Sequence, residues 1–197
     1  TGAEAIHPGF GFLSENSKFA TMCEEVGIKF IGPSGAVMDL MGDKINARAQ
    51  MIKAKVPVIP GSDGEVHTSE EALEVAEKIG YPVMLKASAG GGGKGIRKVE
   101  KAEDLVAAFE SASSEAKAAF GNGAMYMERV IYPARHIEVQ ILADQQGHVV
   151  HLGERDCSLQ RNNQKVLEES PSVAIGKTLR QQIGEAAVRA AQSVGYE

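Results

Sequence analysis

The pattern of apolar and polar positions along the first third of the chain predicts three helices. Apolar residues that recur every three or four positions mark the buried face of an amphipathic helix. One helix is expected over 13–27, ending at a glycine, and two shorter ones between 32 and 57, the second with Asp43 as its N-cap. The expected buried faces carry Phe19, Met22, Cys23 and Val26 in the first helix and Ile45, Ala49 and Ile52 in the last. A short strand over 28–31 separates them.

In the middle of the chain, helices alternate with short strands. A helix is expected to begin after Thr68, whose hydroxyl can form a capping box with Glu71, and to end at Gly80. Strands are expected over 81–87, 96–99 and 124–130, with a further helix between the last two. The expected buried helix faces carry Leu73, Ala76 and Ile79, and then Leu105, Ala108, Phe109 and Ala112.

The last third of the chain predicts a hairpin followed by a helix. Ile137, Val139 and Ile141 alternate with polar residues, which is the period-2 pattern of a half-buried strand. Residues 144–147 predict a turn into a partner strand over 148–152, so at least one sheet is antiparallel. The final helix is expected over about 178–193, with Leu179, Ile183, Ala187 and Ala190 on one side.

Composition and charge narrow the class of protein. The 197 residues are 43% hydrophobic and 24% charged, which is ordinary for one or two globular domains and excludes a disordered or fibrous chain. With 21 Lys and Arg against 26 Asp and Glu, the net charge of -5 does not suit a general nucleic-acid binder. No apolar stretch reaches the ~20 residues of a membrane span. Cys23 and Cys157 lack metal-ligand spacing, which favours a cytoplasmic protein without structural zinc.

A glycine run is the strongest local signal of chemistry. Five of the six residues over 90–95 are glycine, but the strand expected after them argues against a dinucleotide-binding motif, and Lys94 is not followed by Ser or Thr as in a Walker A loop. Two interpretations remain, a flap whose backbone N–H groups cover a triphosphate and a flexible surface loop. Lys86 at the end of the preceding strand would meet the phosphates under such a flap, although a solvated strand end remains the alternative.

Six motifs are spread in order over nearly the whole chain. They are Ala5-Ile6-His7-Pro8-Gly9-Phe10-Gly11-Phe12-Leu13-Ser14-Glu15-Asn16, Met41-Gly42-Asp43-Lys44, Lys86-Ala87-Ser88 with the glycine run, Tyr126-Met127-Glu128-Arg129, Arg135-His136-Ile137-Glu138-Val139-Gln140, and the segment 154–165. Together they resemble biotin carboxylase, an ATP-grasp enzyme and the ATP-using component of acetyl-CoA carboxylase.

The resemblance implies a fold of the α/β and α+β class, as an internal piece of an ATP-grasp enzyme. Residues 1–40 would form the end of an N-terminal α/β domain, and 41–61 a linking helix and strand. Residues 62–131 would form the mobile ATP-grasp lid, and 132–197 the first half of a C-terminal antiparallel-sheet domain. Because the chain starts without Met, we expect it to be cut from a longer protein.

The resemblance also implies roles for single residues. Lys44 and Lys86 would contact the ATP phosphates, backed by the flap residues Gly91, Gly92 and Gly93. Glu128 would accept from the adenine amino group and the Val130 backbone would pair with the ring, with Arg129 and Ile131 beside the base. His136 would face the ribose hydroxyls, Gln160 and Asn163 would lie beside the nucleotide, and Lys165 would hold bicarbonate as the catalytic cation. Asn162-Asn163 stands where the family often has Arg-His, Ala89 replaces a glycine, and Lys94 replaces an arginine.

The implied reaction is ATP-dependent carboxylation of biotin through carboxyphosphate. The substrates and partners would be ATP, bicarbonate, a biotinylated carrier protein and a carboxyltransferase, in a cytoplasmic homodimer that binds neither nucleic acid nor membrane. The Mg²⁺ ligands of the family would lie beyond residue 197, so no metal ligand is assigned and the chain alone is expected to be inactive.

Three alternatives stay open at this point. The parent could be a pyruvate or propionyl-CoA carboxylase. It could be another ATP-grasp ligase such as carbamoyl-phosphate synthetase, which should lack the segment 154–165. The chain could also be a non-catalytic nucleotide-binding module.

Overall fold

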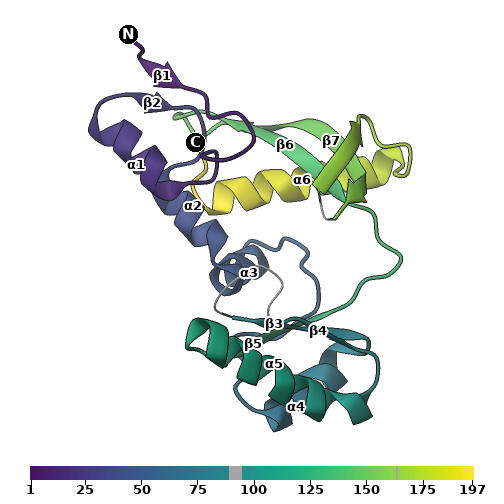
Figure 1. The fold of residues 1–197 in the computed structure, drawn as a ribbon. Coiled ribbons are helices and arrows are strands. Elements are labelled where there is room, and N and C mark those ends of the chain that lie inside the picture. The colour runs from purple at the N-terminus through teal and green to yellow at the C-terminus, as the bar shows by residue number, and fades with distance from the viewer. Residues whose placement is uncertain (89–94, 163) are drawn as a thin grey trace. The chain divides into compact units, whose positions relative to one another are not determined.

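The computed structural model describes residues 1–88, 95–162 and 164–197, which form a mixed fold of helices and mainly antiparallel sheets (Figure 1). The chain divides into two compact units. The split unit comprises Thr1–Pro57 and Arg135–Glu197, and the central unit comprises Val58–Ala134. Four residues with an expected nucleotide role, Gly91, Gly92, Gly93 and Asn163, lie outside the described residues.

In the central unit, two helices pack on one face of a three-stranded antiparallel sheet (Figure 1). The helices are α4 (Ser69–Ile79) and α5 (Leu105–Phe120), the latter preceded by a short 3₁₀ helix, η1 (Ala102–Asp104), and the strands are β3 (Val83–Ala87), β4 (Arg97–Val99) and β5 (Met125–Arg129), in the order β4-β3-β5. Because successive strand residues point to opposite faces, Val83, Leu85 and Ala87 are buried against the helices. Lys86 lies on the other face of the sheet.

The apolar period and the capping residues of this unit predicted its helices α4 and α5 correctly. The buried helix faces are confirmed, with Ala76, Ile79, Leu105, Phe109 and Ala112 all in one core. The hydroxyl of Thr68 accepts from the N–H of Glu71 at 3.2 Å, as expected of the cap. The reciprocal bond differs, because the Glu71 carboxylate accepts from the N–H of His67 at 2.8 Å and not from that of Thr68. Gly80 caps the end of α4 with a φ of 82°, a conformation that glycine adopts without strain.

The N-terminal part of the split unit has a two-stranded parallel sheet, β1 (Ala5–Ile6) and β2 (Lys29–Phe30), and three short helices. The helices are α1 (Ser17–Glu25), α2 (Gly35–Gly42) and α3 (Lys44–Lys53), capped by the side chains of Asn16, Ser34 and Asp43 respectively. Two expected buried faces were wrong in part. In α1, Cys23 is buried, but Met22 and Val26 are exposed because this short helix packs only through a narrow stripe. In α3, Ala49 and Ile52 are exposed, because its neighbours α2 and α6 leave that face uncovered.

The C-terminal part of the split unit is an antiparallel sheet with one long helix packed against it (Figure 1). The strands are β6 (Ile137–Ala143), β7 (Val149–Arg161) and β8 (Gln164–Glu169), and the helix is α6 (Lys177–Ser193). The predicted hairpin is confirmed, since the N–H of Gly147 donates to the Asp144 carbonyl at 3.2 Å. Leu179, expected on the buried side of α6, is exposed in its first turn.

Strand β7 continues nine residues past the predicted end at 152, and β8 was not predicted at all. The apolar alternation fails there because the buried side chains of β7 include Glu154 and Asp156. Arg180 donates a hydrogen bond to the Glu154 carboxylate, and the Ser172 hydroxyl donates one to the Asp156 carboxylate. Both donors lie outside β7, far from these carboxylates in the sequence. Every residue of β8 is exposed, so that strand has no buried face to give a pattern. No helix of the described residues combines the length and the apolar character needed to cross a membrane.

Candidate functional site

In the central unit, Lys86 and Glu128 form an ion pair on the sheet face that points away from the helices. Glu128 lies directly opposite Met84 in the ladder between β3 and β5, which places it diagonally across from Lys86. The Lys86 ammonium donates to Glu128 Oε1, and both side chains are about three-quarters covered, with 27% and 22% exposed. An ammonium has three donors, so this ion pair leaves Lys86 able to donate to a phosphate as well. The structure thus brings together two residues that the family resemblance assigned to ATP.

The segment after Glu128 leaves the sheet with its backbone already hydrogen-bonded. The N–H of Arg129 donates to the Pro60 carbonyl and the N–H of Val130 donates to the Pro82 carbonyl, both at 2.8 Å. A contact between the Val130 backbone and an adenine ring would therefore have to use the carbonyl or break this bond. The side chain of Ile131 is half exposed, which leaves apolar surface at the position expected for the base.

In the split unit, His136 and Gln160 are joined across β6 and β7. Gln160 Nε2 lies 2.7 Å from His136 Nδ1 and donates to the Cys157 carbonyl at 2.9 Å. The backbone of His136 is held by the Ser158 hydroxyl, which accepts its N–H at 3.0 Å, and by the Cys157 N–H, which donates to its carbonyl at 2.8 Å. Two residues expected beside the nucleotide therefore form one hydrogen-bonded pair, with His136 directly before β6.

Lys165 belongs to a cluster of charges on the same sheet. Its ammonium donates to Glu138 Oε2, while Arg155 Nε donates to Glu138 Oε1 at 2.6 Å. Both cations also lie near Glu168, with Lys165 Nζ at 4.0 Å and Arg155 Nε at 3.5 Å. Burial opposes ionisation of Glu138, but the bonds from Lys165 and Arg155 outweigh it and lower the pKa of Glu138 to about 2. The bond to Glu138 in turn raises the pKa of Lys165, so this lysine is a permanent cation.

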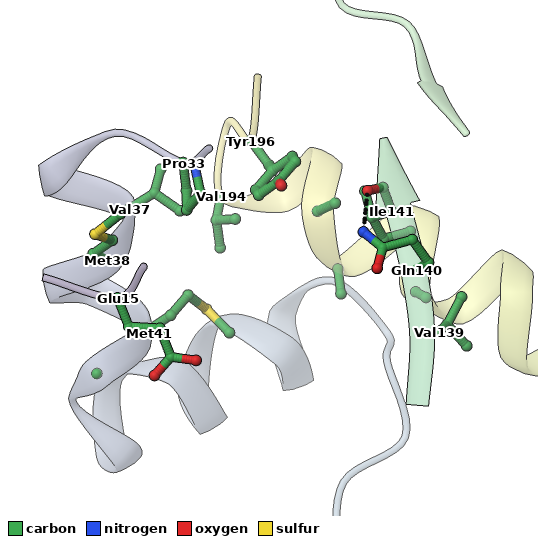
Figure 2. Close-up of a pocket in the computed structure, with 14 residues that line it drawn as sticks. Glu15, Pro33, Val37, Met38, Met41, Val139, Gln140, Ile141, Val194 and Tyr196 are labelled. Atoms are coloured by element: carbon green, nitrogen blue, oxygen red, sulfur yellow. Dashed lines mark hydrogen bonds between the residues drawn. The ribbon is translucent and has the colours of Figure 1, made fainter. Parts of the chain in front are cut away.

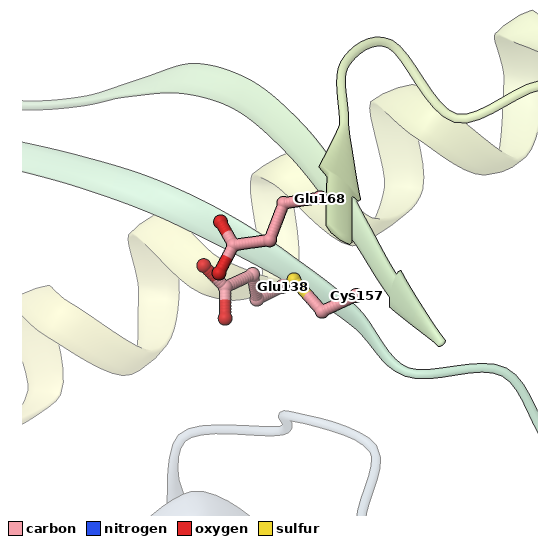
Figure 3. Close-up of side chains that lie close together, drawn as sticks. All are labelled: Glu138, Cys157 and Glu168. Atoms are coloured by element: carbon pink, nitrogen blue, oxygen red, sulfur yellow. The ribbon is translucent and has the colours of Figure 1, made fainter. Parts of the chain in front are cut away.

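Glu138, Glu168 and the buried Cys157 converge in this cluster (Figure 3). Their ligand atoms lie within 4.8 Å of one another, a spacing that three metal ligands could have. The two carboxylates are already balanced by Lys165 and Arg155. Burial, with Glu138 and Glu168 nearby, raises the pKa of the Cys157 thiol and keeps it protonated. The arrangement is therefore a charge-balanced ion-pair cluster that presents Lys165.

Lys44 is the first residue of α3, directly after the cap. Asp43 Oδ1 accepts from the N–H groups of Ile45 and Asn46, both at 3.0 Å. A lysine at this end of a helix opposes the helix dipole, so helix stability does not explain its presence. Among the described residues, no hydrogen bond or ion pair links Lys44 to His136, Gln160 or Lys165.

The apolar pocket of the split unit lies elsewhere. It has a volume of about 590 Å³ and is formed by residues of α2, β6 and α6, with side chains such as Val37, Met41, Ile141 and Val194 in its wall (Figure 2). Glu15 is its single charged lining residue, and no residue with an expected nucleotide or bicarbonate role lines it. Its apolar wall does not suit a polyphosphate, so we do not assign the nucleotide to it.

Sequence reasoning missed the partners of the expected site residues. Glu138, Arg155 and Glu168 orient Lys165, and Ser158 anchors His136, yet none of these four was expected to have a role of its own. The alternation over 137–141 could have found Glu138, because it places this carboxylate on the polar face of the strand.

Two models of known protein families match nearly the whole chain between them. Residues 43–197 match the family model described as "Carbamoyl-phosphate synthase L chain, ATP binding domain", and residues 1–38 match "Biotin carboxylase, N-terminal domain". The first match places the larger part of the chain in the ATP-grasp class of ATP-binding domains. Because its span includes 154–165, that segment does not by itself separate the two kinds of ligase. With the second match and the relatives described next, the chain belongs to the biotin carboxylase family.

Individual relatives are similar along the whole chain. Biotin carboxylase of Nostoc sp. is 57% identical over 194 residues, which cover 98% of this chain and 43% of the relative. One pyruvate carboxylase subunit of Methanothermobacter thermautotrophicus is 52% identical over 196 residues, covering 100% of this chain and 40% of the relative. The crystal structure of the biotin carboxylase domain dimer of 2-oxoglutarate carboxylase from Hydrogenobacter thermophilus, in complex with MgADP, ADP and bicarbonate, superposes with a TM-score of 0.81 at 53% identity, covering 99% of this chain and 43% of that chain. The chain thus spans less than half the length of these relatives.

Proposed function

We propose that the protein to which this chain belongs carboxylates biotin on a carrier protein, using ATP and bicarbonate. Bicarbonate attacks the γ-phosphate of ATP to give carboxyphosphate and ADP, and the carboxyl group then passes to a ureido nitrogen of biotin with release of phosphate. The observation that carries the proposal is the similarity to biotin carboxylases from one end of the chain to the other, at more than half identity. A solved relative that binds both a nucleotide and bicarbonate supports it.

The polar groups of the central unit suit a nucleotide. The Lys86 ammonium would contact phosphate oxygens through the donors that Glu128 does not use, and Lys44 of the split unit would add a second point charge. The Glu128 carboxylate has about four acceptor positions, so it can accept from an adenine amino group while it holds Lys86. The flap residues Gly91, Gly92 and Gly93 are proposed to cover the phosphates, as part of a lid over 62–131.

The split unit is proposed to hold the ribose and the second substrate. His136 would contact the ribose hydroxyls, with Gln160 and Asn163 beside the nucleotide. Lys165 would hold bicarbonate, which requires that the anion share this ammonium with Glu138. The cluster around Glu138 is neutral as a whole, so bicarbonate would add a negative charge beside two existing carboxylates. We therefore expect bicarbonate to bind weakly if Lys165, Arg155, Glu138 and Glu168 are its only neighbours.

Mg²⁺ would assist phosphoryl transfer from ATP by offsetting the charge of the phosphates. Among the residues that the structure describes, Glu138, Cys157 and Glu168 form the one group of three potential ligands within metal-binding distance. This group does not fit Mg²⁺, because its carboxylates are paired with Lys165 and Arg155 and a protonated thiol is a poor ligand for a hard cation. No magnesium ligand is therefore assigned among the residues of 1–88, 95–162 and 164–197.

The finer proposal is that the carboxyl group is destined for acetyl-CoA, which would place the protein in fatty acid biosynthesis, in the cytoplasm. The similarity to relatives from a pyruvate carboxylase and from a 2-oxoglutarate carboxylase supports pyruvate and 2-oxoglutarate as acceptors equally. We also propose that the protein is a homodimer, because the solved relative is a dimer of its biotin carboxylase domain.

The test uses the whole protein with ATP, Mg²⁺, labelled bicarbonate and biotin. We expect acid-labile label to be fixed on biotin and ADP to form in proportion, with both lost when biotin or bicarbonate is omitted. Nucleotide turnover that ignores biotin but depends on ammonia would instead identify a carbamoyl-phosphate-forming ligase. Binding of ATP without any turnover would identify a non-catalytic module.

A further inference from the structure

The amide of Gln160 faces two groups at once, and one of them fixes its orientation. Gln160 Nε2 is 2.9 Å from the Cys157 carbonyl oxygen and 2.7 Å from His136 Nδ1. A carbonyl oxygen can only accept, so the amide must turn its NH₂ group and not its oxygen toward Cys157. That nitrogen has two hydrogens to donate, and therefore His136 Nδ1 is the acceptor of the second one.

This contact decides where His136 carries its own hydrogen. A neutral imidazole has one N–H and one acceptor nitrogen, so an accepting Nδ1 places the hydrogen on Nε2. The side chain of His136 is exposed, so this Nε2–H is accessible to a ligand. In this state His136 can donate a hydrogen bond outward but cannot accept one.

The backbone beneath His136 is held in place independently of the ring. Its N–H donates to the Ser158 hydroxyl at 3.0 Å, and that hydroxyl donates to Asp156 Oδ1 at 2.5 Å. Asp156 is buried and also accepts from the Ser172 hydroxyl at 3.1 Å. Among the hydrogen bonds of the described residues, the contact with Gln160 is the one that the His136 ring makes.

His148 in the turn between β6 and β7 shows the opposite arrangement. Its Nδ1 lies 2.8 Å from Asp144 Oδ2. The bond from His148 contributes most to lowering the pKa of Asp144, so that carboxylate is ionised and can only accept. Nδ1 of His148 must therefore carry a hydrogen. Two histidines, one just before β6 and one just before β7, thus have Nδ1 atoms that differ in protonation, which provides an internal reference.

We infer that Gln160 is a positioning residue that holds His136 as its Nε2–H tautomer, so that His136 donates a hydrogen bond to an oxygen of the bound nucleotide. The identity of that ligand rests on the proposed function, whereas the tautomer rests only on the contacts of Gln160. A ribose hydroxyl fits as the partner, because its oxygen can accept from Nε2–H.

The first experiment measures the tautomer directly, by nitrogen-15 NMR of the whole protein labelled at histidine, at about pH 8.5, where free imidazole is neutral. The His136 signals are identified by their loss in His136→Asn. We expect Nδ1 of His136 to be the unprotonated nitrogen and Nδ1 of His148 to be protonated.

In Gln160→Glu the carboxylate can only accept, so we expect the hydrogen of His136 to move to Nδ1. Gln182→Glu on α6, the same change at an exposed site, should leave both histidines unaltered. A protonated Nδ1 at His136 in the unsubstituted protein, or an unchanged tautomer in Gln160→Glu, overturns the inference.

The second experiment asks whether the tautomer matters for the nucleotide. In the whole protein, Gln160→Glu should raise the KM for ATP about tenfold, the effect of losing roughly one hydrogen bond, while the KM for bicarbonate stays the same. Gln182→Glu should change neither constant. An unsubstituted protein without carboxylase activity would refute the proposed function but leave the NMR result standing. An active protein whose KM for ATP does not change in Gln160→Glu would refute the positioning role.

Discussion

Replacing Lys86 with alanine should weaken ATP binding by the whole protein. The substitution removes an ammonium that lies at the end of β3, just before the glycine run, on the sheet face that it shares with Glu128. It leaves the sheet core intact, because Val83, Leu85 and Ala87 carry the packing of β3 and point to the other face. The measured change therefore reports the charge and its hydrogen bonds.

The expected magnitude follows from the surroundings of the ammonium. A hydrogen bond between charged groups is worth about 1.5–3 kcal/mol, which corresponds to a roughly 10- to 150-fold rise in the dissociation constant of ATP. Lys86 is 27% exposed, so solvent screens it only in part. Removal of Lys86 also leaves the Glu128 carboxylate without its cation, next to where the phosphates or the base would bind. We therefore expect a value in the upper half of this range.

Isothermal titration calorimetry of the whole protein with ATP measures this change. Lys98→Ala provides the matched control, because it removes an equal charge from the neighbouring strand β4, where Lys98 is exposed and paired with Glu100 at 2.7 Å. The control should change the dissociation constant less than about twofold, as is usual for an exposed ion pair. If Lys86→Ala and Lys98→Ala have equal effects, Lys86 does not bind the phosphates.

Four further outcomes are expected. Lys165→Ala should raise the bicarbonate concentration needed for half-maximal rate while leaving ATP affinity nearly unchanged, and steady-state kinetics with either substrate varied would expose the reverse pattern. Glu138→Gln should flatten the acid dependence of stability, because a carboxylate with its pKa lowered from 4.5 to about 2 stabilises the fold above pH 4.5 and loses this effect as the pH falls through 2. Acid titration followed by circular dichroism measures this, and identical curves for the two proteins would contradict it. Leu85→Ala should destabilise the central unit by about 2–5 kcal/mol, because Leu85 is completely buried, and urea unfolding monitored against Met84→Ala on the opposite face would reveal an error. The 197-residue chain alone should not carboxylate biotin, and label fixed on biotin by this chain would disprove that expectation.

The sequence by itself determined those helices and turns that are specified by interactions between residues close together in the chain. Helices α4 and α5 follow from an apolar period and from caps such as Thr68 and Gly80, all of which act within a few residues. The turn at Gly147 between β6 and β7 is encoded in the same way. The family also follows from the sequence alone, because its motifs are strings of neighbouring residues in a fixed order.

Only the tertiary structure decided which site residues meet. Lys165 and Glu138 are 27 positions apart, and Gln160 and His136 are 24 apart. Their encounters depend on the register between strands, which shifts between Val139 and Ile141 and again near Leu159. A bulge moves later side chains to the other face of a sheet, and nothing in the local apolar pattern marks where it occurs. Strand β8 escaped prediction for a different reason, because all its residues are exposed and it pairs with β7 without a buried face that would give an apolar pattern.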